Sequence, residues 1–89
     1  DSDAIRETNS SILASSAAVC GCDGALCRLM ELGLRDQALE MGSEVAPLAA
    51  EFTRLRLALH EGKGAKIADA ARSNAERSLA LLHKIRANY

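Results

Sequence analysis

Three cysteines lie close together in the pattern Cys20-x-Cys22-x4-Cys27, and their thiolates are the first groups in the chain that could do chemistry. A structural zinc site takes four ligands in tetrahedral geometry, and its cysteines usually come in C-x2-C pairs. Here the spacing does not fit such pairs, no fourth ligand is nearby, and both histidines lie far along the chain. We therefore expect small buried thiols at the start of a helix, and no metal.

The segment His60-Glu61-Gly62-Lys63-Gly64 resembles the H-x-x-K-G motif of histidine phosphotransfer domains. In that family an exposed, mid-helix imidazole accepts the phosphoryl group and the lysine steadies its charge. The glycines after His60 instead predict the C-terminal end of a helix, where an imidazole complements the helix dipole. Phosphotransfer at His60 stays open as an alternative, and His83 is likewise expected in the last turn of a final helix.

No other pattern predicts catalysis. No serine, cysteine or lysine has a base placed near it by the sequence, no glycine loop follows a strand, and no carboxylate pair is repeated. A chain of 89 residues buries only about two thirds of its unfolded surface, so an extensive buried active site is not expected. We therefore expect a binding module that is not an enzyme and has no cofactor.

The composition predicts a single all-α domain spanning residues 1–89. Seventeen alanines and thirteen leucines stand against one phenylalanine, one tyrosine and no tryptophan. Alanine and leucine are the best helix formers, whereas strands are rich in aromatic and β-branched residues. Small alanine side chains add little buried area, so stability is expected to depend partly on a partner.

Glycines and capping residues divide the sequence into about five predicted helices. A first helix over residues 3–19 and a turn at residues 20–24 form an N-terminal unit, residues 1–22. Residues 23–42 form a first hairpin folded at Gly33, and residues 43–87 form a second, longer hairpin with its turn at residues 62–64. Asp3, Asp23, Asp36 and Ser43 are the expected N-caps, and Pro47 is expected in the first turn of the helix that begins at residue 43. The last two helices carry apolar stripes, Val45, Leu48, Ala49, Phe52, Leu55 and Leu59 in one, and Ile67, Ala71, Asn74, Ser78, Leu81 and Ile85 in the other.

The net charge of −1 conceals an asymmetry between the two halves of the chain. Residues 1–51 carry nine acidic and three basic residues, and residues 52–89 carry eight basic and three acidic residues. The favoured interpretation is that acidic and basic helices pack side by side, with the charges solvated at the rim. A basic surface for nucleic acid or for an acidic protein is the alternative, although no aromatic residues interleave the eight cations: Arg54, Arg56, Lys63, Lys66, Arg72, Arg77, Lys84 and Arg86.

The stretch from Gly33 to Glu40, preceded by Leu26, Leu29 and Leu32, resembles the turn and second helix of a tetratricopeptide repeat. A narrower resemblance is to the small tetratricopeptide-like chaperones of type III secretion needle subunits. It is carried by an L-x-x-L-x-x-x-G-x-x-x-x-A-L-x-x-G pattern and a later Gly-x-Gly-small turn, here Leu26, Leu29, Gly33, Ala38, Leu39, Gly42 and the segment Gly62-Lys63-Gly64-Ala65.

This resemblance implies helical hairpins stacked as a short array around a groove. In that family the groove holds the apolar C-terminal helix of the needle protein, with a second small helical protein at the chaperone's other side. We therefore expect a virulence-associated chaperone that keeps a filament subunit from polymerising prematurely. Its groove is expected to be lined by apolar residues off the main stripes, Cys27, Met30 and Leu57, together with Arg54.

The location of the protein is predicted from what the sequence lacks. The chain does not begin with methionine, and it shows no charged-then-apolar leader and no apolar run near 18 residues. The odd number of cysteines favours reduced thiols over a disulfide framework. We therefore expect a trimmed, soluble chain that works in the cytoplasm.

Overall fold

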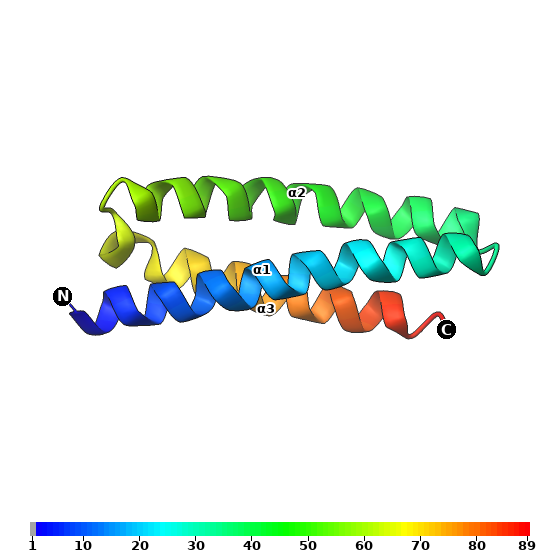
Figure 1. Ribbon diagram of the computed structural model, residues 1–89, viewed down its shortest axis with the longest axis horizontal. Coiled ribbons are helices and arrows are strands. Elements are labelled where there is room, and N and C mark those ends of the chain that lie inside the picture. The colour runs from blue at the N-terminus through cyan, green and yellow to red at the C-terminus, as the bar shows by residue number, and fades with distance from the viewer. Residues whose placement is uncertain (1) are drawn as a thin grey trace.

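Helical structure runs almost unbroken through the computed structural model, which describes residues 2–89. The helices are α1 (Ser2–Glu31), α2 (Arg35–His60) and α3 (Ala68–Arg86), and a short 3-10 helix, η1 (Gly64–Ile67), precedes α3. The three long helices lie side by side in a rod of 48 × 18 × 14 Å, with α1 and α3 parallel and α2 antiparallel to both (Figure 1). The all-α prediction is confirmed for these residues. Asp1, which belongs to the predicted N-terminal unit, lies outside them.

Two glycines end the first two helices in the same way. Gly33 and Gly62 have φ angles of 77° and 82°, a left-handed conformation that glycine adopts without steric cost. The next residue in each case donates back to the carbonyl five residues earlier, Leu34 to Leu29 at 2.9 Å and Lys63 to Ala58 at 3.0 Å. This is the Schellman arrangement, which satisfies carbonyls at a helix end. The predicted turns at Gly33 and at residues 62–64 are confirmed.

The prediction of about five helices is wrong, because α1 continues through residues 20–24 and α2 continues through residues 42–43. The glycines at these two places sit in ordinary helical backbone, and only Gly33 and Gly62 have positive φ among the described residues. A helical glycine costs roughly 1 kcal/mol relative to alanine, which packing along a long helix can offset. The predicted hairpins over residues 23–42 and 43–87 are therefore not structural units, and a tetratricopeptide-like array is not confirmed.

All four predicted caps and the proline occupy other positions, including Asp3, which lies in the first turn of α1. Asp23 lies within α1, and Ser43 lies within α2, where its hydroxyl donates to the carbonyl of Glu40 at 2.6 Å. Asp36 lies in the first turn of α2, after an N-cap position at Leu34 that makes no side-chain capping bond. Pro47 is in the interior of α2, where it has no N–H to offer the carbonyl of Ser43.

Alternating spacings of three and four residues relate the positions that face the core of each helix. This 3.5-residue period is the mark of helices that pack as a left-handed coiled coil. The predicted stripes of the second half are confirmed as core positions, although Ala49 lies beside its stripe. The buried or half-buried positions that follow this period are Thr8, Ile12, Ser15, Val19, Cys22, Leu26 and Leu29 in α1; Ala38, Met41, Val45, Leu48, Phe52, Leu55 and Leu59 in α2; and Ile67 in η1 with Ala71, Asn74, Ser78, Leu81 and Ile85 in α3.

A layer of polar side chains divides the core into two apolar clusters. One cluster surrounds Leu29 near the α1–α2 turn, and the other surrounds Leu55 nearer the opposite end. Between them lie Ser15, Asn74 and Ser78, each at most 1% exposed. The amide of Asn74 donates to the carbonyl of Leu48 at 3.1 Å, which ties α3 to the backbone of α2. Asn74 Oδ1 and the hydroxyls of both serines have no hydrogen-bond partner within the described protein.

Two side-chain hydrogen bonds join α1 to the last part of the chain, one to η1 and one to α3. Thr8 donates to the carbonyl of Gly64 at 2.7 Å, and Cys22 donates to the carbonyl of Ser78 at 3.7 Å. Both pairs are separated by 56 residues along the chain. The same register places Ser15 opposite α3 one turn from Asn74, so the polar layer is continuous across the parallel helices.

The two oppositely charged halves of the chain meet through ion pairs at the helix edges. Each of these pairs joins an acidic residue of the first half to a basic residue of the second. They are Glu7–Arg72, Glu44–Lys84 at 3.1 Å and Glu51–Arg77 at 2.9 Å. The predicted side-by-side packing of acidic and basic helices is therefore confirmed. Exposed pairs of this kind contribute about 0–1 kcal/mol each and mainly set which edges meet.

Candidate protein-binding surfaces

A shallow groove runs between the parallel helices α1 and α3. It has a volume of about 390 Å³, and Leu79 at its edge is 48% exposed. The two helices approach closely next to the groove, where a Cβ atom added to Gly21 would lie 2.9 Å from Cδ2 of Leu82. Its lining is apolar apart from one carboxylate, and consists of Ala14, Ala17, Ala18, Ala75, Glu76, Leu79 and Leu82.

A second hollow, of about 570 Å³, lies between α2 and α3 beside Pro47. Its apolar lining includes Leu48, Ala80 and Leu81. The ion pairs Glu44–Lys84 and Glu51–Arg77 join α2 to α3 at the hollow, one helical heptad apart. These two ion pairs bridge α2 and α3, so a guest along this hollow would meet charged side chains at both ends. The α1–α3 groove is the better site for a helix.

The four predicted groove residues do not line one surface. Cys27 and Met30 are exposed near the end of α1, and Arg54 and Leu57 are exposed on the second half of α2. The end of α1 packs against the beginning of α2, whereas the Leu55 region packs against Ile12. The two pairs are therefore separated by on the order of 20 Å along the bundle. The structure does not bring the two pairs together, because the prediction assumed short hairpins in which these residues would have been neighbours.

The three cysteines have different environments. Cys22 faces the core, and burial raises the pKa of its thiol, helped by the carboxylate of Asp23 and opposed by Arg86. Cys20 and Cys27 are free and exposed in the second half of α1. The prediction of buried thiols at a helix start is therefore correct only for the burial of Cys22. Cys20 and Cys27 are two helical turns apart, about 10 Å, which is too far for a disulfide between them. Among residues 2–89 no group of His, Cys, Asp and Glu side chains could hold a metal ion.

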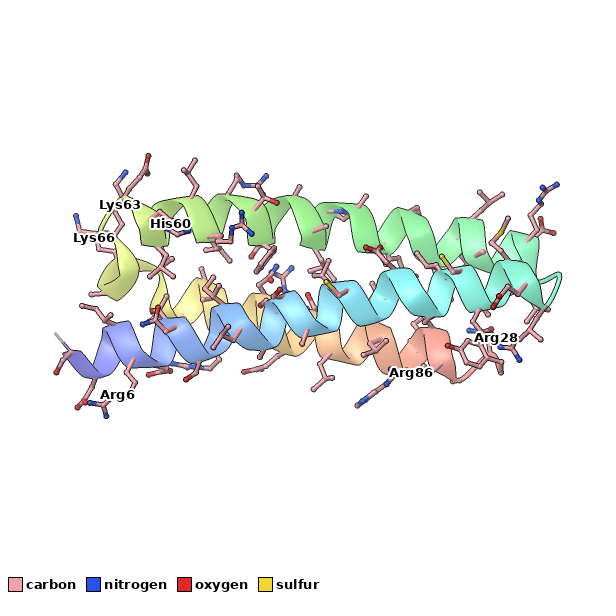
Figure 2. All side chains as sticks on the ribbon, viewed as in Figure 1. Arg6, Arg28, His60, Lys63, Lys66 and Arg86 are labelled. Carbon is pink, nitrogen blue, oxygen red and sulfur yellow. The ribbon has the colours of Figure 1, made fainter. Side chains whose placement is uncertain are left out.

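Several of the basic residues that make no interhelical ion pair lie toward the two ends of the rod. Figure 2 shows His60, Lys63 and Lys66 around the α2–η1 turn, and Arg28 and Arg86 toward the other end. His60 is the exposed last residue of α2, as predicted, and lies at a helix end and not mid-helix. Separate ends do not form a continuous basic track of the kind that follows a nucleic-acid backbone.

The outward side of α1 is uncharged over a long stretch. No charged residue occurs from Thr8 to Cys22, and a second heptad series of exposed positions lies opposite the core series. We refer to this series as the outer face of α1. Its members are Ser10, Leu13, Ala17, Cys20, Gly24 and Cys27. Apart from Cys27, none of them was identified as a site residue from the sequence, although the alternating spacing of three and four residues was readable there.

The same helix is long and apolar enough to cross a membrane, judged by length and composition alone. The prediction that no apolar run approaches this length is therefore wrong for α1. Part of the helix is buried against α2 and α3, and the core helix of a soluble protein passes the same test.

No protein-family model matches the chain, and neither curated proteins nor solved structures give a match. The candidate binding surfaces of the protein are therefore the groove, the hollow and the outer face of α1.

Proposed function

We propose that the protein is a protein-binding module that holds an amphipathic helix of a partner in the α1–α3 groove. In the form suggested by the resemblance to needle-subunit chaperones, the partner is an aggregation-prone filament subunit and the protein acts in the cytoplasm. Covering the apolar helix through which such a subunit polymerises would keep it monomeric. The relation to tetratricopeptide-like chaperones is itself part of this proposal.

The observation that carries the proposal is the composition of the groove. Four alanines and the exposed Leu79 form its walls, with Glu76 as the single charged residue. Small side chains allow a third helix to approach both axes closely, and the exposed leucine offers area that gains free energy when a guest covers it. A groove between two helices that receives the apolar face of a third is a recurrent mode of peptide recognition.

The charges around the groove indicate the chemistry of the guest. The ion pair between Glu7 and Arg72 lies toward one end, and Arg28 and Arg86 lie toward the other (Figure 2). A matching guest has apolar residues at positions i, i+3 or i+4, and i+7, and acidic residues where it lies beside Arg28 and Arg86. Its apolar stripe would cover Leu79 and the alanines of α1.

The core of the bundle supports a role that involves a partner. The core contains buried polar side chains, and α1 contacts α3 through alanines, so less apolar area is buried than in a leucine-rich bundle. A guest that binds only the folded state adds stability in proportion to the logarithm of its concentration. We expect the isolated protein to be of modest stability and to gain cooperativity when the guest is bound.

The proposal is tested by measuring binding of the C-terminal helix of a needle subunit by titration calorimetry, with thermal unfolding followed by circular dichroism. Leu79→Glu should weaken binding at least about tenfold, because it places a charge on the apolar wall. Leu39→Glu is the matched control, since Leu39 is 67% exposed on α2, away from the groove. Equal weakening by both variants, or binding that is unaffected by Leu79→Glu, would overturn the proposed groove. Absence of binding to this helix and to designed helices of the stated pattern would overturn the function.

A further inference from the structure

We propose that the outer face of α1 is an interface with a second copy of this chain, in which two α1 helices pair in parallel about a twofold axis. The interface goes beyond the proposed guest-binding function and does not depend on it. It shares Ala17 with the lining of the α1–α3 groove, and Arg28 with the charges proposed to meet the guest, whereas Leu13 belongs to this face alone and Leu79 to the groove alone. The two surfaces can therefore be tested with separate variants.

The outer face of α1 has the geometry of a coiled-coil seam. Leu13, Cys20 and Cys27 occupy one heptad position, seven residues apart, and Ser10, Ala17 and Gly24 occupy the other. All six residues are exposed, and Leu13 is 71% exposed, the most of the exposed large apolar residues. The core-facing heptad of the same helix points the opposite way, so a second α1 can approach without displacing α2 or α3.

Charge complementarity selects a second copy as the occupant, and selects the parallel orientation. In a parallel pair, a residue that directly precedes a member of the Ser10, Ala17 and Gly24 series lies opposite a residue of the other helix whose number is higher by five. For this seam the rule places Asp23 opposite Arg28 of the second copy, and twofold symmetry makes the pair twice. An antiparallel pair would instead place residues of the Asp23 series opposite each other, without an opposite charge.

Both charged residues are available for this contact. Asp23 is exposed, and none of the ion pairs found among the described residues includes it. Arg28 contacts Glu31 in its own helix at 3.6 Å, with both side chains more than half exposed. An exposed contact of this length between residues three apart contributes little and can be exchanged for the interchain pair.

The area of the face indicates a weak, reversible dimer. One helix against one helix over residues 10–28 extends for about 27 Å. Such a contact belongs to the small class of interfaces, below roughly 1,200 Å² in total. We therefore expect dissociation constants in the range of about 10 μM to 1 mM under reducing conditions.

The two exposed cysteines report on the orientation of the helices. In a parallel pair Cys20 faces Cys20 of the second copy, and Cys27 faces Cys27. With oxidised glutathione as the oxidant, one cysteine thiolate attacks its disulfide and releases a glutathione thiolate. The matching cysteine of the second copy then attacks the mixed disulfide and releases the second glutathione. Two protein thiols are oxidised to one disulfide, and one oxidised glutathione is reduced to two thiols.

The association is tested by sedimentation velocity of the full chain under reducing conditions, between about 10 μM and 1 mM. The wild-type protein should shift from monomer to dimer within this range. Leu13→Asp should weaken association at least about tenfold, whereas Leu39→Asp, a matched change on α2, should leave it unchanged. Asp23→Arg should weaken it, and the double variant Asp23→Arg/Arg28→Asp should recover most of the loss. A wild-type protein that stays monomeric to about 1 mM, or equal effects of Leu13→Asp and Leu39→Asp, overturns the interface.

The orientation is tested by oxidation with a glutathione redox buffer. Cys20→Ser and Cys27→Ser should each still give a disulfide-linked dimer, and the double variant should give none. If each single variant loses the crosslink, the helices are antiparallel and the parallel interface is refuted.

Sedimentation with anionic and with neutral phosphatidylcholine vesicles tests whether a membrane, and not a second copy, covers the outer face of α1. Vesicle binding that Leu13→Asp abolishes, without self-association of the wild type, would assign the face to a membrane and overturn the dimer. Leu79→Glu should leave self-association intact, so failure of the guest-binding proposal can be told apart from failure of this one.

Discussion

Replacing Asn74 with leucine is expected to raise the free energy of unfolding by about 2 kcal/mol. Asn74 is fully buried, and its Oδ1 has no hydrogen-bond partner within the described protein. An unsatisfied buried acceptor costs about 1–3 kcal/mol, and removing it recovers that cost. The bond from its amide to the carbonyl of Leu48, which is worth about 1 kcal/mol, is lost. Burial of the leucine side chain adds roughly 1.5–3 kcal/mol to the free energy of unfolding. Strain reduces this gain by about 1–2 kcal/mol if the side chain fits poorly.

The change is measured by urea unfolding and by thermal unfolding followed by circular dichroism. For a domain of this size, about 2 kcal/mol corresponds to a rise in Tm of roughly 8–16 °C. Samples are compared at equal, low concentration so that self-association does not contribute. Because Asn74 ties α3 to α2 at one position, the leucine variant should also show broader NMR resonances from α2, as a less uniquely specified packing would.

Two other buried hydroxyls serve as controls for this reasoning. Thr8→Val removes a hydroxyl that donates to Gly64 at 2.7 Å, and should cost about 1 kcal/mol. Ser78→Ala removes a hydroxyl without a partner, and should be neutral or stabilising by up to about 1 kcal/mol. If Asn74→Leu instead lowers stability by more than about 1 kcal/mol, while the two controls behave alike, the polar layer is a satisfied network and the argument is refuted.

Three further predictions concern packing, backbone conformation and pH. Leu29→Ala should lower the free energy of unfolding by about 2–5 kcal/mol in denaturant titrations, because Leu29 is fully buried in the larger apolar cluster. Gly33→Ala should destabilise the protein by about 1 kcal/mol or more, since the φ angle of Gly33 is 77°. Gly42→Ala should stabilise it by about 0.5–1 kcal/mol, because Gly42 lies in ordinary helix and an added Cβ atom would come no closer than 3.9 Å to another side chain. Equal effects of the two variants would contradict this assignment. Burial raises the pKa of Cys22 above that of an unfolded thiol, so the folded state keeps the thiol proton to higher pH. The resulting contribution to stability should be present below the unfolded pKa, and it should be lost as pH rises through the folded pKa. Cys22→Ala should remove that alkaline loss in pH-dependent unfolding, and Cys20 and Cys27 should react with a thiol reagent well before Cys22 does.

Much of the fold was readable because core positions and helix ends have local causes. The stripe from Ile67 to Ile85 was predicted residue by residue, since its members face the core, Ile67 from η1 and the others from α3. Gly33 and Gly62 were identified as turns, because both follow helical segments and only glycine takes their φ angles without cost. The acidic and basic halves also met as predicted, through edges that the charge pattern had marked.

The remaining errors have a tertiary cause. Gly21 and Gly42 have the local appearance of turns, but both lie inside long helices that pack on the rest of the bundle, and Leu82 lies close over Gly21. Local turn preference cannot reveal a partner 61 residues away, as Leu82 is from Gly21. The predicted groove inherited this error, because Cys27 and Leu57 are neighbours only if the helices are short. The outer face of α1 was accessible in principle from its second heptad series, which the search for a single apolar stripe per helix overlooked.

An odd number of long helices places the ends of the described chain at opposite ends of the rod (Figure 1). A polypeptide that continued in both directions would enter at one end and leave at the other, displaced by most of the 48 Å length. An even-numbered bundle would return the chain to where it entered. This bundle can therefore act as a stiff spacer: inserted between two domains it would hold them apart, and in tandem it would extend a filament.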